Sequence, residues 1–507
     1  MSEVKDAIKD GLDSIVGSKN VFTEPATLEK YSRDQSFTPP RKPNYVVKPK
    51  TLEEAQGIVR LANEQLMPVV PYSSGTDFHG GAVPNHGGIL VDLSQMNKMS
   101  EIDTHFWYVT IEPGVTFARL NEELGKHGFR VLVPLLAPPS ASVLTTYVER
   151  EPVPAAADFI YGNEQIQTMR VVLPNGDSFT MGNPALEGAP HCHVFGPGLN
   201  FYRLFMCAQG TMGIVYQINL RFIPLPKAQK VFFSAFDNVS DVISAMRHIQ
   251  RKEVGFECFA LNNFDLATLV VDEEPADTKR LKNGTYIGNT GAKPWSSAQR
   301  QRLEALRRVL PPWTLVVTIV GWARLPEEKV RYQEVDLRNL AAEAGFELKP
   351  SVGGVTGLAR IIEEEMLLPW RMQKRFGYRG SCHGLMFHAT RSAIPTIEDA
   401  LYQVAAKYHY PPDDIGAYVQ PVERARSFCC VYDLHCDPTN DSEVQRAKAL
   451  FNEASEVLIN VGAFFDRPYG PWAEIMYRRS GTYTEYLKKI KAQLDPNNIM
   501  NPGKLCF

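Results

Sequence analysis

The stretch PYSSGTDFHGGAVP, residues 71–84, decides the fold that we predict for this chain. It lies between two predicted strands and consists mainly of glycines, hydroxyl residues and other small side chains. Such residues let the backbone approach a ligand closely, and successive N–H groups can form a nest for an anion such as a pyrophosphate. Taken alone, the stretch is explained more simply as a tight glycine turn, so the surrounding sequence has to decide.

The sequence around this loop predicts an α+β domain. Residues 44–48 form an apolar strand, and Thr51 is a suitable N-cap for the helical pattern of residues 51–65. We expect further strands at 89–96, 106–115 and 213–226, a helix at 117–128 that ends on Gly128, and a hairpin with Asn175-Gly176 in its turn. Residues 1–16 predict an amphipathic helix without the apolar core of a signal peptide.

A second α+β domain is predicted after the prolines at 224 and 226, where strand and charged-helix patterns such as 230–236, 297–310 and 327–345 begin. The chain length of 507 residues also favours more than one hydrophobic core. We therefore expect a first domain over 1–225, an inserted cap or substrate domain over 226–472, and a return to the first domain over 473–507.

Composition excludes several classes of protein. Hydrophobic residues make up 44% and charged residues 22%, as in ordinary globular proteins. The net charge of −3 provides no basic surface for nucleic acid, and no apolar run reaches the roughly 20 residues that span a bilayer. We expect a cytoplasmic homo-oligomer. His191-Cys192-His193 lacks the spaced partner ligands that a metal site needs, so no metal is predicted there.

Two more small-residue loops strengthen the ligand hypothesis, namely Ala137–Val143 and Gln209–Val215. No Gly-x-Gly-x-x-Gly or Walker loop follows a strand, so nicotinamide and nucleoside triphosphates are disfavoured. With the helix after Thr51 and the terminal DPNNIMNPGK of residues 495–504, the loops resemble, in the same order, the FAD-binding domain of the vanillyl-alcohol oxidase and p-cresol methylhydroxylase superfamily. The resemblance covers nearly the whole chain.

The resemblance implies that extended FAD lies in the first domain, with its isoalloxazine beneath the cap. It implies cofactor-binding roles for a set of loop and terminal residues, which are Pro71, Tyr72, Ser73, Ser74, Gly75, Thr76, Asp77, Gly80, Gly81, Pro138, Pro139, Ser140, Ser142, Val143, Glu149, Gly210, Met212, Gly213, Ile214, Val215, Arg426, Asn501 and Lys504.

Among the branches of the superfamily, the chain resembles the one that oxidises 4-alkylphenols. It lacks the cap histidine cluster and the Gly-Glu-His-Gly stretch of the 2-hydroxy acid branch, and Tyr477-Arg478 is similar to the pair that grips a phenolate. A phenolate loses a benzylic hydride readily because the product is a neutral quinone methide, and a tyrosine and a guanidinium stabilise that anion. The alternative is that Tyr477 packs in a core while Arg478 binds a surface carboxylate.

The sequence departs from that branch at three places. His79 stands where a second phenolate-binding tyrosine is usual, and it could donate a hydrogen bond, act as a base or merely bond the loop backbone. No carboxylate occurs within residues 136–138, where one is expected near flavin N5. The stretch that usually tethers the flavin offers Arg424, Arg426 and Ser427, so we expect dissociable FAD; Arg426 could approach the flavin or lie on a solvated face.

We therefore predict hydride transfer to FAD from a benzylic or allylic carbon of a small hydroxyaromatic substrate, with Tyr477, Arg478 and His79 at the anionic oxygen. Reduced flavin would pass electrons to oxygen or to a protein such as a cytochrome. Two alternatives remain. One is an FAD-dependent 2-hydroxy acid dehydrogenase, in which arginines bind the carboxylate and His79 takes the hydroxyl proton. The other is a non-catalytic flavin-binding electron-transfer subunit.

Overall fold

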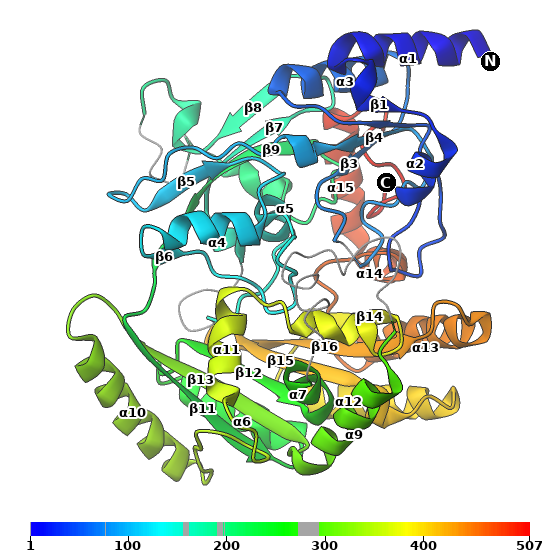
Figure 1. Ribbon diagram of the computed structural model, residues 1–507. Coiled ribbons are helices and arrows are strands. Elements are labelled where there is room, and N and C mark those ends of the chain that lie inside the picture. The colour runs from blue at the N-terminus through cyan, green and yellow to red at the C-terminus, as the bar shows by residue number, and fades with distance from the viewer. Residues whose placement is uncertain (1, 77, 156–161, 190–195, 197, 272–293) are drawn as a thin grey trace.

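Two four-stranded sheets and one six-stranded sheet organise the molecule (Figure 1), and β6 (Phe129–Arg130) pairs with β10 (Ile223–Pro224) in a small two-stranded sheet. The computed structural model describes residues 1–507 except 1, 77, 156–161, 190–195, 197 and 272–293. The first sheet has the order β1-β2-β4-β3 and joins β1 (Val21–Phe22), β2 (Tyr45–Val47), β3 (Val69–Tyr72) and β4 (Ile89–Asp92). Strands β2 and β3 both pair in parallel with β4. The loop after β3 therefore leaves the carboxyl end of a buried parallel strand.

Helices cover the first sheet as the sequence predicts. Helix α3 (Leu52–Glu64) begins after Thr51, whose side chain accepts from the amide of Glu54, and it buries Ala55, Ile58 and Val59. Helix α1 (Ser2–Val16) packs on α3, with Leu12 fully buried in the same core. The amphipathic amino-terminal helix is thus confirmed.

The second sheet carries the middle loops. Its order is β5-β9-β7-β8, from β5 (Tyr108–Ile111), β7 (Ile166–Val172), β8 (Ser178–Met181) and β9 (Ile214–Arg221). Strands β7 and β8 form the predicted hairpin, with Gly176 at φ +83°. Helix α4 (Phe117–Gly125) ends earlier than expected, and Gly128 follows it at φ +79°.

The carboxy-terminal segment returns to the first sheet. The amide of Val69 donates to the carbonyl of Ile499 at 2.7 Å, and the amide of Asn501 donates to the carbonyl of Val69 at 2.8 Å. Met500 therefore bridges β3 in parallel, and Ile499 and Met500 are buried in the core of that sheet. This pairing places the end of the chain beside the loop at 71–84.

The large sheet has the order β11-β13-β12-β15-β16-β14, and all its strand pairs are antiparallel. Its strands are β11 (Ala228–Phe236), β12 (Glu257–Asn262), β13 (Trp313–Gly321), β14 (Ser381–Ala389), β15 (Gly416–Val422) and β16 (Ser427–Cys436).

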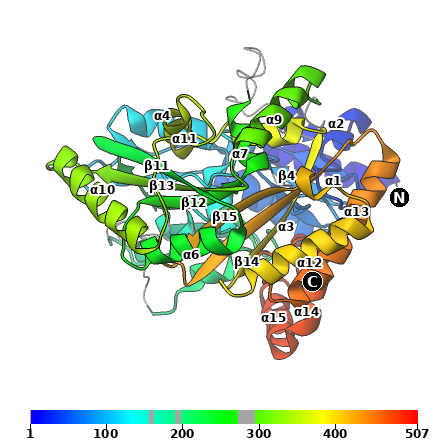
Figure 2. The same cartoon turned by 90° about the horizontal axis from the view of Figure 1, so that it is seen from below.

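Helices pack on both faces of the large sheet (Figure 2). Successive side chains of β13 point to opposite faces of the sheet. Val317 belongs to the core that includes the helices α6 (Val239–Gln250), α10 (Pro326–Glu343), α12 (Ile394–Lys407) and α13 (Asp441–Asn460). Val316 belongs to the core of the other face, which includes α7 (Asn263–Val270), α9 (Ser297–Val309) and α11 (Leu358–Leu367). This sheet lies within 228–436, which supports the boundary at 226 that we propose for the cap.

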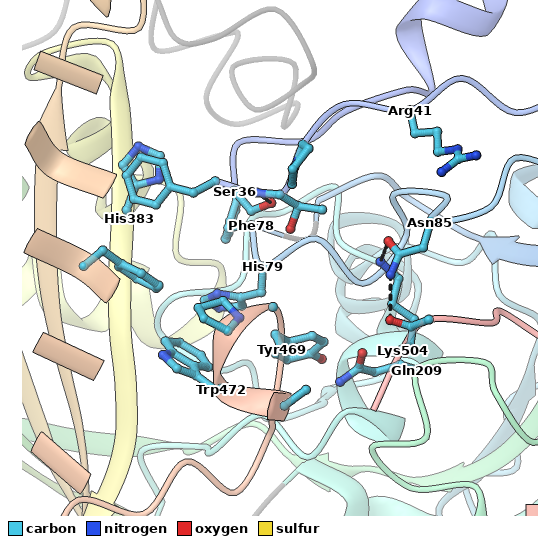
Figure 3. A pocket seen from close by; sticks show the side chains of 18 of the residues that line it. Ser36, Arg41, Phe78, His79, Asn85, Gln209, His383, Tyr469, Trp472 and Lys504 are labelled. Carbon is cyan, nitrogen blue, oxygen red and sulfur yellow. Dashed lines mark hydrogen bonds between the residues drawn. The ribbon is translucent and has the colours of Figure 1, made fainter. Parts of the chain in front are cut away.

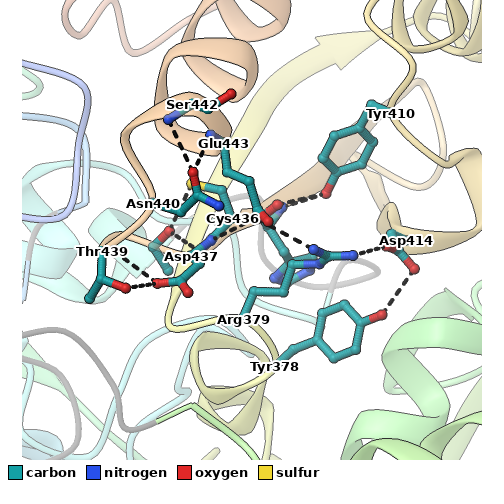
Figure 4. Close-up of polar contacts among 12 residues, drawn as sticks. Tyr378, Arg379, Tyr410, Asp414, Cys436, Asp437, Thr439, Asn440, Ser442 and Glu443 are labelled. Carbon is teal, nitrogen blue, oxygen red and sulfur yellow. Dashed lines mark hydrogen bonds and ion pairs between the residues drawn. The ribbon is translucent and has the colours of Figure 1, made fainter.

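A polar network fixes the entry into β14 (Figure 4). Arg379 donates to Asp414 at 2.9 Å and to Glu443 at 3.4 Å, and the hydroxyl of Tyr378 donates to Asp414 at 2.9 Å. The network joins the segment before β14 to the start of α13. It therefore holds in register the strand that faces the candidate site.

Candidate active site

The three predicted loops meet in one groove, which we call the loop groove. It is lined by β3 and its loop, by α5 (Val143–Val148) with the residues after it, and by the turn before β9. Twelve residues with predicted cofactor roles line it: Pro71, Tyr72, Ser73, Ser74, Gly75, Thr76, Gly81, Glu149, Gly210, Gly213, Ile214 and Val215. The sequence therefore located the groove, although it could not show how the loops meet.

Hydroxyl groups join the first two loops. Thr145 donates to the hydroxyl of Ser73 at 2.9 Å, and the amide of Ser142 donates to the hydroxyl of Ser74 at 3.1 Å. The hydroxyls of Ser74 and Thr76 are 2.9 Å apart. Small hydroxyl side chains beside backbone amides provide the hydrogen bonds that phosphate oxygens accept, so this floor suits a pyrophosphate.

Close backbone contacts explain the glycines of the third loop. A Cβ at Gly210, which has φ +70°, would lie 2.8 Å from the ring of Pro71. At Gly213, which has φ +149°, it would lie 2.6 Å from the carbonyl oxygen of Val172. Only glycine fits both positions, which leaves a backbone-walled groove of the kind that an extended dinucleotide fits.

The carboxy-terminal residues brace the groove. Asn501 donates to the carbonyls of Gly81 and Gln209 at 3.2 and 2.7 Å, and Lys504 donates to the carbonyl of Gly80 at 2.8 Å. The other predicted residues of these loops lie outside the groove lining: Gly80, Pro138, Pro139, Ser140, Ser142, Val143 and Met212. Asp77 and residues 191–193 lie outside the described residues.

The structure corrects the expectation for Arg426. Its side chain is 73% exposed and pairs with Glu423, and the side chain of Arg424 pairs with Glu253. Both arginines sit in the tight turn between β15 and β16, which points them to solvent. Arg426 therefore lies on a solvated face, which is one of the two arrangements that the sequence allowed.

A second, smaller cavity adjoins the loop groove, and we call it the inner cavity. The two share Thr76, Thr146 and Glu151 as wall residues. The inner cavity lies against the cap strands β14 and β16, and its apolar walls come from Leu136, Ala137, Pro138, Phe78, Phe376, Met386 and Val431. A ligand there would lie between the groove and the cap.

A buried ion pair forms the polar part of the inner cavity. Arg375 donates to Asp433 at 3.0 Å, and the side chains are only 4% and 3% exposed. Asp265 lies behind them, and burial, reinforced by the charge of Asp433, raises the pKa of its carboxyl to about 8. Burial therefore favours the protonated form of Asp265 in the folded protein, and the guanidinium of Arg375 lies against Asp433.

The structure separates the three predicted catalytic residues. His79 lines the inner cavity, and its ring stacks on Tyr469 with centroids 5.2 Å apart. Tyr477 lines a different cavity with Arg150 and Cys207, and burial raises the pKa of its hydroxyl. Arg478 is 55% exposed and donates to Glu456 at 3.0 Å, which is the surface carboxylate pairing that the sequence left open.

The reason for this separation is local. Tyr477 and Arg478 belong to helix α14 (Pro471–Arg479). Successive residues of a helix point about 100° apart, and here Tyr477 lines one cavity while Arg478 lies exposed at the surface. The prediction that Tyr477 and Arg478 hold an oxyanion gains no support from this placement.

A different Arg and Tyr lie at the site, just before α14. Arg467, 4% exposed, lies 2.5 Å from Glu151, and the hydroxyl of Tyr469 donates to Glu149 at 2.5 Å. Burial lowers the pKa of Arg467, but Glu151 and Asp466 outweigh it, so the net pKa lies well above its usual value. Sequence reasoning missed them because it searched for an adjacent Tyr-Arg pair, whereas Arg467-Pro-Tyr469 has the same residue types with one residue between.

A third cavity, larger than the loop groove and the inner cavity, is shown in Figure 3, and we call it the outer chamber. It has a volume of about 730 Å³. It shares Phe78, His79 and Gly384 with the inner cavity, and Gln209 and Tyr469 with the loop groove. All three spaces therefore adjoin one another, with wall residues in common.

We also searched the described residues for a metal-binding cluster and for a membrane-spanning helix. No group of three or more His, Cys, Asp or Glu side chains among them is arranged to hold a metal ion. None of their helices combines the length and the apolar character needed to cross a membrane.

Comparison with known proteins agrees with this architecture. Residues 43–182 match a family described as "FAD binding domain", and residues 472–505 match "FAD linked oxidases, C-terminal domain". The chain is 30% identical to the mitochondrial D-lactate dehydrogenase [cytochrome] of Arabidopsis thaliana, over 91% of this chain and 73% of that protein. It is 24% identical to the 4-cresol dehydrogenase [hydroxylating] flavoprotein subunit of Pseudomonas putida, over 97% and 93%.

The fold is also that of a solved flavoprotein. The crystal structure of p-cresol methylhydroxylase with substrate bound matches with a TM-score of 0.83 and 21% identity, over 99% of this chain and 96% of that one. The fold and the connected groove thus define an FAD-dependent oxidoreductase. The chain belongs to the superfamily of FAD-linked oxidases with a p-cresol methylhydroxylase-type FAD-binding domain. This membership favours an enzyme over the non-catalytic electron-transfer subunit.

Proposed function

We propose that the enzyme oxidises a para-substituted phenol or a related hydroxyaromatic alcohol at its benzylic or allylic carbon. The observation that carries this proposal is the inner cavity, which joins the loop groove through Thr76, Thr146 and Glu151 and combines aromatic walls with a buried Arg-Asp pair. An aromatic ring suits the walls of Phe78 and Phe376, and the ion pair suits its hydroxyl group.

The residues of the loop groove would hold FAD, and when bound it supplies the hydride acceptor, N5 of the isoalloxazine. The lining of serines, threonines and glycines is the part of the chain that fits its pyrophosphate. Because the stretch that usually tethers the flavin offers only Arg424, Arg426 and Ser427, we propose that the cofactor is bound without a covalent link.

The inner cavity would activate the phenol before hydride loss. Asp433 accepts the phenolic proton, and Arg375 stabilises the resulting oxyanion by a charge-assisted hydrogen bond. The phenolate then loses a hydride from its benzylic carbon, and the organic product is a neutral quinone methide. His79, at the mouth shared with the outer chamber, is placed to orient the ring or its substituent.

The 2-hydroxy acid dehydrogenase remains the second candidate, and a specific observation favours it. Arg375 could bind a carboxylate instead of a phenolate, with His79 taking the hydroxyl proton. The relative from Arabidopsis thaliana is named for D-lactate. The apolar walls favour the aromatic substrate, because a small hydroxy acid would leave them uncovered.

The electron acceptor of the reduced enzyme is proposed to be oxygen or an electron-accepting protein such as a cytochrome. The named relative from Arabidopsis thaliana carries "cytochrome" in its name, which supports the second possibility.

Substitution of Asp433 tests the proposed chemistry. Asp433→Asn should keep the bound flavin but slow its anaerobic reduction by 4-ethylphenol by at least about 100-fold, the usual contribution of a proton-accepting group. The rate should recover partly at high pH, where the phenol ionises without help. Unchanged kinetics of flavin reduction in this variant would show that Asp433 takes no part in the reaction.

A further inference from the structure

The outer chamber is lined by cations and by no acidic side chain. Arg41, Lys448 and Lys504 all line it, and its described lining residues include neither Asp nor Glu. The whole chain has 57 acidic and 54 basic residues, so this local excess of positive charge does not follow from composition. A cavity with apolar walls and one sign of charge concentrates ligands of the opposite sign.

Two of these cations are available to a ligand. Lys504 already donates to Gly80 and Asn85, whereas Arg41 and Lys448 form no side-chain ion pair with any other residue that the structure describes. Lys448 lies on α13 and is half-buried, and Arg41 lies in the exposed segment that follows α2 (Pro25–Lys30). Figure 3 shows Arg41 and His383 on opposite sides of the chamber.

Aromatic side chains form part of the remaining wall. Phe451 and Trp472 stack with centroids 5.5 Å apart, and Phe37 stacks on His383 at 3.9 Å, so these faces cover one another. An aromatic ligand would meet the edges of such rings, which is a favourable T-shaped contact, and the volume of about 730 Å³ lies within the range of small-molecule sites. Positive charge and stacked aromatic rings together select a particular ligand chemistry.

We propose that the outer chamber binds an aromatic carboxylate, with Lys448 and Arg41 as its anion-binding residues. Because the chamber shares Phe78, His79 and Gly384 with the inner cavity, one molecule can place a phenol in the inner cavity and a carboxylate in the chamber. In that form the inference rests on the proposed function and narrows its substrate to a hydroxyaryl acid. Alternatively, the carboxylate belongs to a separate aromatic acid that binds beside the substrate.

Binding to the oxidised holoenzyme tests the inference without turnover. The probes are 3-(4-hydroxyphenyl)propanoate and its neutral amide, titrated by calorimetry at low and high salt. The acid should bind about tenfold more tightly than the amide, as expected for one charge-assisted contact, and the preference should shrink with salt. Equal affinity for acid and amide would overturn the proposal.

Matched variants locate the effect. Lys448→Gln and Arg41→Gln should each weaken binding of the acid by about threefold, half of the tenfold preference in free energy, and leave the amide unchanged, whereas Lys448→Arg should retain it. Arg446→Gln removes the same charge from the same helix, outside the chamber lining, and should change neither ligand. Variants that fold, by thermal unfolding, yet bind the acid normally would also overturn the proposal.

Two further measurements distinguish a carboxylate on the substrate from a separate aromatic acid, and they distinguish this inference from the proposed function. If the carboxylate belongs to the substrate, Lys448→Gln raises KM for the hydroxyaryl acid and leaves KM for 4-ethylphenol unchanged. If it belongs to a separate molecule, 3-phenylpropanoate binds with the affinity of the hydroxylated acid while 4-ethylphenol is turned over. Selective binding of the acid by an enzyme whose flavin no phenol reduces would refute the proposed function alone.

Discussion

The guanidinium of Arg467 lies 2.5 Å from the carboxylate of Glu151, and this pair joins the passage before α14 to the loop that lines both the groove and the inner cavity. Breaking a buried pair from one side leaves an uncompensated charge, which costs about 3–5 kcal/mol. We expect Arg467→Gln to lower the free energy of unfolding by that order and to reduce flavin content. Urea unfolding and the ratio of flavin to protein absorbance measure both effects.

Arg478 is the matched control for Arg467. It is 55% exposed, and exposed ion pairs contribute little to stability or to a distant site. Arg478→Gln should therefore keep flavin content and 4-ethylphenol turnover within about twofold of the wild type. A loss of turnover as large as that of Arg467→Gln would restore Arg478 to the active site.

Gly210 should be indispensable for the groove. Gly210→Ala places a Cβ 2.8 Å from the ring of Pro71 at a backbone with φ +70°, so the third loop has to move away from the first. We expect a loss of bound flavin, measured by absorbance after gel filtration. Gly188→Ala is the control, because Gly188 has φ +76° but no atom within 4 Å of the added Cβ. If Gly210→Ala keeps as much flavin as Gly188→Ala, the close contact with Pro71 does not control flavin binding.

Asp265 should make stability depend on pH. Burial raises the pKa of its carboxyl from 3.8 to about 8 in the folded protein. The folded state therefore holds a proton that the unfolded state releases. This contribution is fully present below about pH 4 and is lost as the pH rises to about 8, by at most about 1.4 kcal/mol per pH unit.

Asp265→Asn should remove that dependence. The free energy of unfolding of the variant, from urea titrations, should fall less than that of the wild type between about pH 5 and 8. Asp413→Asn changes a side chain that is 91% exposed and should follow the wild type. Parallel curves for the wild type and Asp265→Asn would show that Asp265 is ionised in the fold.

Local signals in the sequence were enough to predict the fold and the loop groove. The N-cap at Thr51, the Asn175-Gly176 turn and the glycines at 210 and 213 each dictate a backbone conformation that neighbouring residues determine. The terminal DPNNIMNPGK segment also resembled a known family, from which we expected a return to the first domain, and the structure pairs residues 499–501 with β3.

The residues that we propose for catalysis, Arg375 and Asp433, could not be predicted in the same way. Arg375 and Asp433 are 58 residues apart, and only the pairing of β14 with β16 beside η6 (Met372–Gly377) brings them together. Tyr477-Arg478 showed the opposite error, because an adjacent pair of suitable residue types lies on a helix that separates their side chains. Tertiary contacts between distant strands carry information that a local motif lacks.

The most direct test of the proposed function is anaerobic titration of the oxidised enzyme with 4-ethylphenol, 4-hydroxybenzyl alcohol and D-lactate, followed by flavin absorbance. The aromatic walls of the inner cavity and the Arg375–Asp433 pair predict that the two phenols bleach the oxidised flavin band and that D-lactate does not. Bleaching by D-lactate alone would contradict the proposal and assign the enzyme to 2-hydroxy acid oxidation.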